Sequence, residues 1–246
     1  MTRIAVEPGH FAIYVGTGIP ALLIQHLPQR LLALNSSVAE RLGLSSTPPD
    51  VYVYATSAQL REGVCVSPAT VAYYDGAIHL ALTPHDDAYS ELFGSLRHEL
   101  VHHVLFSHGI RRPVWFQEGA AMIIAEEWHW FSWHPKARLL RPEQMVATFP
   151  QTTSAEEANA FYGQAFAMTT FLKSLCRKRK SCSLADLTQA LASGAATPET
   201  LFDWATRRYG SDLIGTTLLP LWDDFVQNGF ELAPATESAL QQRSAR

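Results

Sequence analysis

Two hydrophobic patterns follow one another along the chain, and the change falls near residue 85. Before it, short runs rich in valine, isoleucine and tyrosine alternate with polar residues, which is typical of half-buried β-strands. A leucine-rich helical pattern from about Pro20 to Leu42 interrupts them, although it contains Pro28. Asp75-Gly76 is a strong signal for a hairpin turn. The sequence predicts strands at His10–Val15, Val51–Tyr54, Thr70–Tyr74 and Ala77–Leu82.

Beyond residue 85, apolar residues recur at three- and four-residue spacings, which is the period of an amphipathic helix. The first run extends from Leu92 to Leu105 and is expected to end at His108-Gly109, because glycine readily adopts the left-handed cap conformation. Thr83–Asp87 supplies an N-cap candidate and acidic residues for the first turn. Pro113 is expected to open the next helix. Further helices are predicted at Phe161–Cys176, Leu184–Leu191, Pro198–Tyr209 and Leu218–Gln227.

These patterns predict an α+β fold in which a small N-terminal mixed sheet precedes a mainly helical part. We expect an N-terminal α/β subdomain over residues 1–84, a helical part over residues 85–232, and a polar, frayed tail over residues 233–246. A hydrophobic content of 47% with 17% charged residues is typical of a packed globular chain.

Charge and hydropathy argue against nucleic-acid and membrane partners. A net charge of −4 gives no electrostatic basis for binding nucleic acid. No stretch approaches the roughly 20 apolar residues that span a bilayer, and Met1–Pro8 lacks the features of a signal peptide. We therefore expect a soluble protein, cytoplasmic as written, or periplasmic or secreted if a signal peptide has been removed. The oligomeric state stays open.

Cysteine usage does not decide the compartment. Of the three cysteines, Cys176 and Cys182 could pair across the basic segment between them. The odd count leaves one thiol, Cys65, without a partner in that arrangement.

The chemistry of the chain is concentrated in His98-Glu99-Leu100-Val101-His102. On a helix, residues four apart lie one turn on and about 40° apart around the axis, so both imidazoles can hold one metal ion. Glu99 lies further round the same helix and can reach a water on that ion. Two neutral nitrogen ligands and a carboxylate base are the parts of a catalytic zinc site. The motif therefore predicts one Zn²⁺ held by His98 and His102, with Glu99 as general base.

Glu118 is the predicted third ligand. It lies sixteen residues beyond His102, in the helical segment Pro113–Ala121. A helix, a short turn and an antiparallel helix would bring its carboxylate back against both imidazoles. Zinc would then keep its fourth position open, as a catalytic site requires.

With these motifs in place, the chain resembles the gluzincin branch of the peptidase MA superfamily, which consists of zinc metallopeptidases. The resemblance is to the bacterial peptidase MA-like group and covers about residues 85–175. Three motifs carry it: H-E-x-x-H at residues 98–102, W-x-x-E-G-x-A at Trp115–Ala121, and a weaker aromatic element at Tyr162-Gly163-Gln164.

The resemblance implies a zincin-like fold and hydrolysis of peptide bonds in a peptide or protein substrate. It also implies that Tyr162 donates a hydrogen bond to the oxyanion; the alternative, a buried helix aromatic among Phe161, Phe166 and Phe171, is slightly favoured. In zincins the strand beside the metal helix offers its edge to an extended substrate. By this resemblance, Ala77–Leu82 is expected to bind substrate by strand addition, with His79 an ordinary strand residue.

Two alternatives compete with this interpretation. A metzincin site uses H-E-x-x-H-x-x-G-x-x-H, and His108 stands at its third histidine position. However, Leu105 replaces the glycine that turns the chain, and on an unbroken helix His108 lies about 240° round from His102. We therefore favour Glu118. Outside enzymes, the alternative is a non-catalytic peptide or cell-wall binding module that keeps zinc for structure. Glu99 argues against it, because structural zinc needs no general base.

The segment Glu126–Pro135 contains half of the six tryptophans of the chain. It is either an aromatic wall of a substrate cleft or a packing element that caps the core, and packing is favoured.

Overall fold

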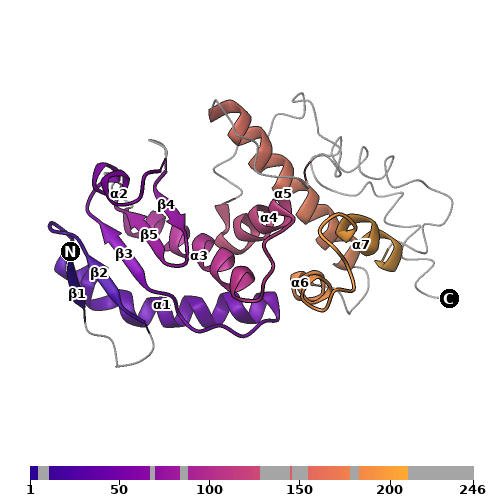
Figure 1. Cartoon of the computed structure of the whole chain (residues 1–246), viewed down its shortest axis with the longest axis horizontal. Helices are drawn as coiled ribbons and strands as arrows, with labels where there is room; N and C mark the ends of the chain where they lie inside the picture. The colour runs from indigo at the N-terminus through magenta and orange to yellow at the C-terminus, as the bar shows by residue number, and fades with distance from the viewer. Residues whose placement is uncertain are drawn as a thin grey trace. The chain divides into compact units, whose positions relative to one another are not determined.

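The computed structural model describes residues 1–4, 11–66, 70–83, 88–127, 145, 155–177 and 183–209. They form a mixed α/β structure, in which a small N-terminal sheet is followed by a mostly helical remainder (Figure 1). By packing, the chain divides into two units: residues 1–108 with 124–126, and residues 109–123 with 127–246. These two units are defined by how the residues pack. The boundary predicted at residue 84 was placed where strand patterns give way to helical ones, and it stays a prediction.

The first unit is built on a five-stranded sheet in the order β1-β2-β3-β5-β4. The strands β2, β3 and β5 run parallel, and β1 and β4 pair antiparallel at the two edges. The bounds are β1 Thr2–Ile4, β2 Ile13–Val15, β3 Val51–Tyr54, β4 Ala72–Tyr74 and β5 Ile78–Ala81. The four predicted strands are confirmed, each over a core of three or four residues. β1 was not predicted, because a strand this short depends on pairing with β2 and carries no pattern of its own.

The position of β5 overturns one expectation. β5 is paired with β3 on one side and with β4 on the other, so the backbone groups of both its edges are already engaged. The prediction that Ala77–Leu82 adds a substrate strand was therefore wrong, because only an edge strand has a free row of donors and acceptors. Among the described strands, β4 and β1 occupy the edges.

The hairpin between β4 and β5 is confirmed, with a loop one residue longer than a two-residue turn. Tyr74 pairs with Ile78, so Asp75, Gly76 and Ala77 form the loop. Gly76 has a φ of 123°, which glycine adopts without a steric penalty. The Asp75 carboxylate accepts a hydrogen bond from the Ala77 N–H at 3.2 Å.

The two faces of the sheet differ, as the two-residue period of a strand requires. One face is aliphatic, and its members are at most 5% exposed: Ile13, Val15, Val51, Val53, Ile78 and Leu80. On the other face Tyr14, Tyr52 and His79 lie side by side across three strands. Their rings stack at 4.5 and 4.8 Å between centroids, with 8° between the planes.

His79 is a buried strand residue, as expected. Its Nε2 lies 3.2 Å from Oδ1 of Asp75, and its Nδ1 lies 3.0 Å from the Tyr54 hydroxyl. Because a carboxylate only accepts, Nε2 carries the proton and the tyrosine hydroxyl donates to Nδ1. This chain of bonds joins the hairpin loop to β3.

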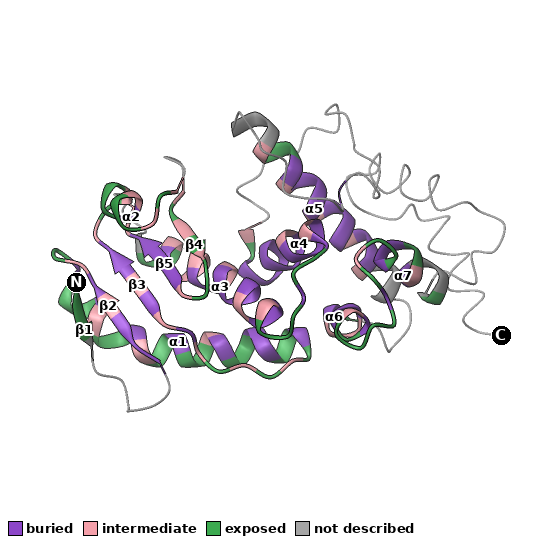
Figure 2. Cartoon of the chain, viewed as in Figure 1, coloured by how far each residue is buried: buried purple, intermediate pink, exposed green. Residues whose placement is uncertain are grey.

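Three helices accompany the sheet: α1 Ala21–Leu42, α2 Ser57–Gly63 and α3 Ala88–Ser107. α1 and α3 are confirmed where the periodicity placed them, and α1 continues through Pro28. Buried and exposed residues alternate along α1, which buries one leucine-rich stripe (Figure 2). α2 was missed. Its signal was Thr56, three residues before Gln59, because the Thr56 hydroxyl accepts from the Gln59 N–H at 3.2 Å.

Two histidines bind the segment that follows α1, and they are His103 within α3 and His108 just after its last residue. His103 Nε2 donates to the Thr47 carbonyl at 2.8 Å, and His108 Nε2 donates to the Ser45 carbonyl at 2.7 Å. Burial lowers the pKa of His103, and the bond to Thr47 opposes that shift. The imidazole is therefore neutral, and its Nδ1 accepts from the Tyr74 hydroxyl at 3.2 Å. α3 ends before Gly109, whose φ of 73° confirms the predicted cap.

The described part of the second unit is helical. Its elements are α4 Val114–Ala125, α5 Ala155–Arg177, α6 Leu184–Ala192 and α7 Leu201–Tyr209. The sequence predicted all four helices, and most of the predicted bounds lie within a few residues of the observed ones. Aromatic rings join three of them, since Phe202 of α7 stacks on Phe171 of α5 at 5.8 Å and meets Trp115 of α4 edge-on at 6.4 Å. None of the described helices combines the length and the apolar character needed to cross a membrane.

Several expectations fall outside the described residues. They are the acidic first turn at residues 84–87, the tryptophan-rich segment from Trp128 onward, the helix Leu218–Gln227, the tail after residue 232, and the pairing of Cys176 with Cys182. Cys65, which is described, is exposed and carries a free thiol.

Gly119 sets the distance between α4 and α5. A Cβ atom at this position would lie 2.3 Å from the Ala165 carbonyl oxygen and 2.1 Å from Oγ1 of Thr169. The first of these is backbone and cannot turn aside, so α5 leaves no room for a side chain here. Glycine follows Glu118 because α4 and α5 come into contact at this position.

We predict that Gly119→Ala destabilises the protein by about 2–3 kcal/mol, because the added methyl group forces the two helices apart. Gly94→Ala is the matched control, since a Cβ at Gly94 of α3 has nothing within 4 Å. That change should stabilise by up to about 1 kcal/mol, because alanine is the better helix former. Urea unfolding measures both, and equal effects of the two substitutions would contradict this account of Gly119.

We also predict that His103→Phe costs about 1–3 kcal/mol, because it removes the acceptor of the part-buried hydrogen bond from the Tyr74 hydroxyl. His108→Phe should cost less than about 1 kcal/mol, because His108 is exposed and water can replace its single bond. The midpoints of urea unfolding compare the two variants. A His108 variant at least as unstable as the His103 variant would refute the assignment.

Candidate metal centre

α3 brings His98 and His102 to one side of a buried helix. The intervening and following apolar residues Leu100, Val101 and Val104 are fully buried and fix the rotation of the helix about its axis. The two imidazoles, four residues apart, have ring centroids 5.1 Å apart with 57° between their planes. This is the arrangement that the H-E-x-x-H spacing predicts.

α4 carries Glu118 one turn after the helix begins. Pro113 precedes the first helical residue, and its carbonyl accepts from the N–H groups of Phe116 and Gln117 at 3.2 and 3.3 Å. The proline thus opens the helix, as expected. The buried Trp115 and Phe116 hold the first turn in the apolar interior, so the position of Glu118 is set by its neighbours in sequence.

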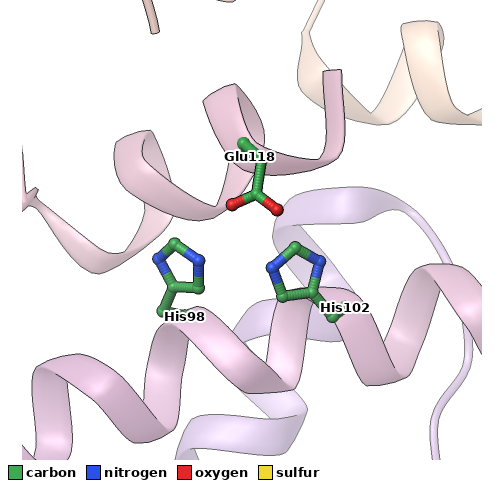
Figure 3. Close-up of side chains that lie close together, drawn as sticks. All are labelled: His98, His102 and Glu118. Carbon is green, nitrogen blue, oxygen red and sulfur yellow. The ribbon is translucent and has the colours of Figure 1, made fainter. Parts of the chain in front are cut away.

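His98, His102 and Glu118 form one group that could hold a metal ion. Each offers a ligand atom, and these atoms all lie within 4.8 Å of one another (Figure 3). The carboxylate points toward both rings. Tetrahedral zinc with nitrogen and oxygen ligands near 2.1 Å would set them about 3.4 Å apart. Two imidazole nitrogens and one carboxylate oxygen suit a borderline divalent cation.

Glu99 lies next to His98 in sequence and outside the ligand group. It is 8% exposed and is the only carboxylate among the buried polar side chains of the described residues. Burial of a carboxylate is costly unless charges or hydrogen bonds compensate it. Its position is therefore consistent with a chemical role beside the ligands.

The remaining histidine of α3, His103, and His108 just after the helix have other partners. His103 and His108 bind the backbone carbonyls of Thr47 and Ser45, and neither belongs to the ligand group. Their placement thus supports Glu118 over His108 as the third ligand. Tyr162 lies half-buried on α5 with its ring edge-on to Phe161, at 6.4 Å between centroids. Its role in catalysis stays a prediction.

Sequence reasoning missed the residues that hold the end of α4. Arg41 at the end of α1 donates through Nη1 to the Ile124 carbonyl at 3.1 Å. Nη1 of Arg97 lies 3.9 Å from Oε2 of Glu126. Neither contact has a local signal, because the first joins residues 83 positions apart. The only hint was an arginine directly before the H-E-x-x-H motif.

In comparison with known proteins, no family model matches the chain, and no curated protein matches it. The resemblance to gluzincins therefore depends on the motif residues themselves.

Proposed function

We propose that the protein is a zinc-dependent metallopeptidase of the gluzincin type that hydrolyses peptide bonds in a peptide or protein substrate. The observation that carries the proposal is the group of His98, His102 and Glu118, with the buried Glu99 beside it. Ligands alone would satisfy a structural metal, whereas a carboxylate placed next to them and outside their set suits a general base.

Zinc is the metal that this donor set fits best. His₂Glu with an open position is one of the known ligand sets of catalytic zinc. Imidazole also suits copper, iron and nickel, so the identity of the ion is part of the proposal. When bound, zinc would polarise the substrate carbonyl and lower the pKa of water to about 7.

The residues of the chain divide the remaining work. Glu99 takes the proton from the attacking water and then delivers it to the leaving amine, which makes departure of the amine possible. Glu118 and the two histidines hold the centre and take no proton. Tyr162 is the proposed donor to the oxyanion that develops on the carbonyl oxygen. A substrate that adds to the sheet as a strand would pair with β4, because β4 is the described edge strand beside the interior β5.

We predict that Glu99→Gln keeps the metal and lowers turnover by about 100- to 10,000-fold, because the amide cannot accept the proton. Glu118→Ala should weaken zinc binding by more than about 100-fold, since even residues outside the ligand set contribute 10- to 100-fold. Bound zinc is measured by elemental analysis, and cleavage by a mixed peptide library.

His108→Ala is the matched control for the metal measurement. It removes an imidazole just after the end of α3, and we expect zinc content and turnover close to those of the parent. Loss of zinc in this variant with retention in Glu118→Ala would establish the metzincin-type site instead. Zinc retained in the parent with no cleavage of any peptide would support the non-catalytic binding module.

A further inference from the structure

The C-terminal end of α4 is attached to the first unit by two arginines. Arg41 lies in the last turn of α1 and donates to the carbonyl of Ile124. Arg97, which directly precedes His98 on α3, lies opposite the carboxylate of Glu126. Residues 124–126 accordingly pack with the first unit.

The bond from Arg41 meets a specific need of α4. The last four carbonyls of a helix have no partner within it, and they form the negative end of the helix dipole. Ile124 supplies one of these carbonyls and is fully buried. α4 has no basic residue of its own in its last turn. Arg41 therefore provides both the missing donor and the missing positive charge, and charged donors form the stronger hydrogen bonds.

Glu126 indicates independently that this end of α4 is held in place. Its φ is 63°, in the left-handed region where glycine is the favoured residue, and it is the only non-glycine residue with positive φ in the described part of the chain. A side chain in this conformation carries a steric cost. Glutamate at this position gains what glycine lacks, a carboxylate facing Arg97.

From these contacts we infer that Arg41 is a positioning residue for the third metal ligand, with Arg97 and Glu126 in support. Glu118 lies six residues before Ile124, about 9 Å along the axis of the same helix. A helix transmits a shift of one end to the other, so the bond at Ile124 constrains where the Glu118 carboxylate lies. The inference rests on the proposed metal site.

Zinc titration of the purified, metal-free full chain tests this role. Arg41→Met keeps the apolar stem and removes the charged donors. We expect its zinc dissociation constant to rise about tenfold, the scale on which outer residues tune metal sites. Arg41→Lys should recover part of that loss, since one charged donor remains. Arg30→Met is the matched control, because it removes a second arginine of α1. The Arg30 guanidinium lies over the ring of Phe93 on α3, 5.8 Å from its centroid, instead of at the end of α4. Its zinc affinity should equal that of the parent.

Two further measurements separate positioning from general stability. In the Glu118→Ala background, Arg41→Met should weaken zinc binding no further, because the ligand through which it acts is gone. Glu126→Gly should raise or preserve the thermal midpoint, because glycine relieves the left-handed backbone, while it weakens zinc binding several-fold.

The outcomes that overturn the inference are distinct from those that overturn the proposed function. If the parent binds no zinc through His98, His102 and Glu118, both the proposed function and the positioning role of Arg41 are overturned. If the parent binds zinc and Arg41→Met has the same zinc dissociation constant, only the positioning role of Arg41 is overturned. The same holds for a loss of affinity that persists fully in the Glu118→Ala background, because it would show that Arg41 acts elsewhere.

Discussion

The structure depends above all on the burial of α3. This helix packs against α1 and against β4 and β5, and its leucines and valines are almost fully buried. Three of its polar side chains, His98, Glu99 and His102, are therefore held in surroundings where a polar group needs a partner. A second helix supplies the carboxylate of Glu118, and a cation shared by that carboxylate and the two imidazoles is the arrangement that we propose, with Glu99 outside it.

Local patterns were sufficient to predict the parts that lie close together in sequence. The periodicity of α3 and α4, the proline before α4 and the glycine after α3 each have a local physical cause, and Glu118 follows from a helix, a turn and a second helix. The order of strands depends on pairing between distant segments, and so the interior position of β5 could not be read from its composition. α2 and β1 were missed for a related reason, because short elements depend on their partners more than on their own residues.

The three histidines of α3, together with His108 just after its end, show why residue type alone does not define a site. His98 and His102 belong to the ligand group, while His103 and His108 bind carbonyls of the segment after α1. The helical period separates His103 from His98 and His102, since only residues on a common side can share an ion, and His108 lies beyond the end of the helix. The contact between Arg41 and Ile124 illustrates the opposite limit, because its two residues come together only through the tertiary fold.

The ladder of Tyr14, Tyr52 and His79 has a consequence for what the sheet can recognise. Both faces of the Tyr52 ring are covered by its neighbours, so only the edge and the hydroxyl group of this ring remain outside the stack. A planar base or a sugar ring that approached the middle of the ladder would find no free π-surface on which to stack. The aromatic residues of these strands thus serve cohesion between neighbouring strands, and recognition at that point would have to proceed through hydrogen bonds.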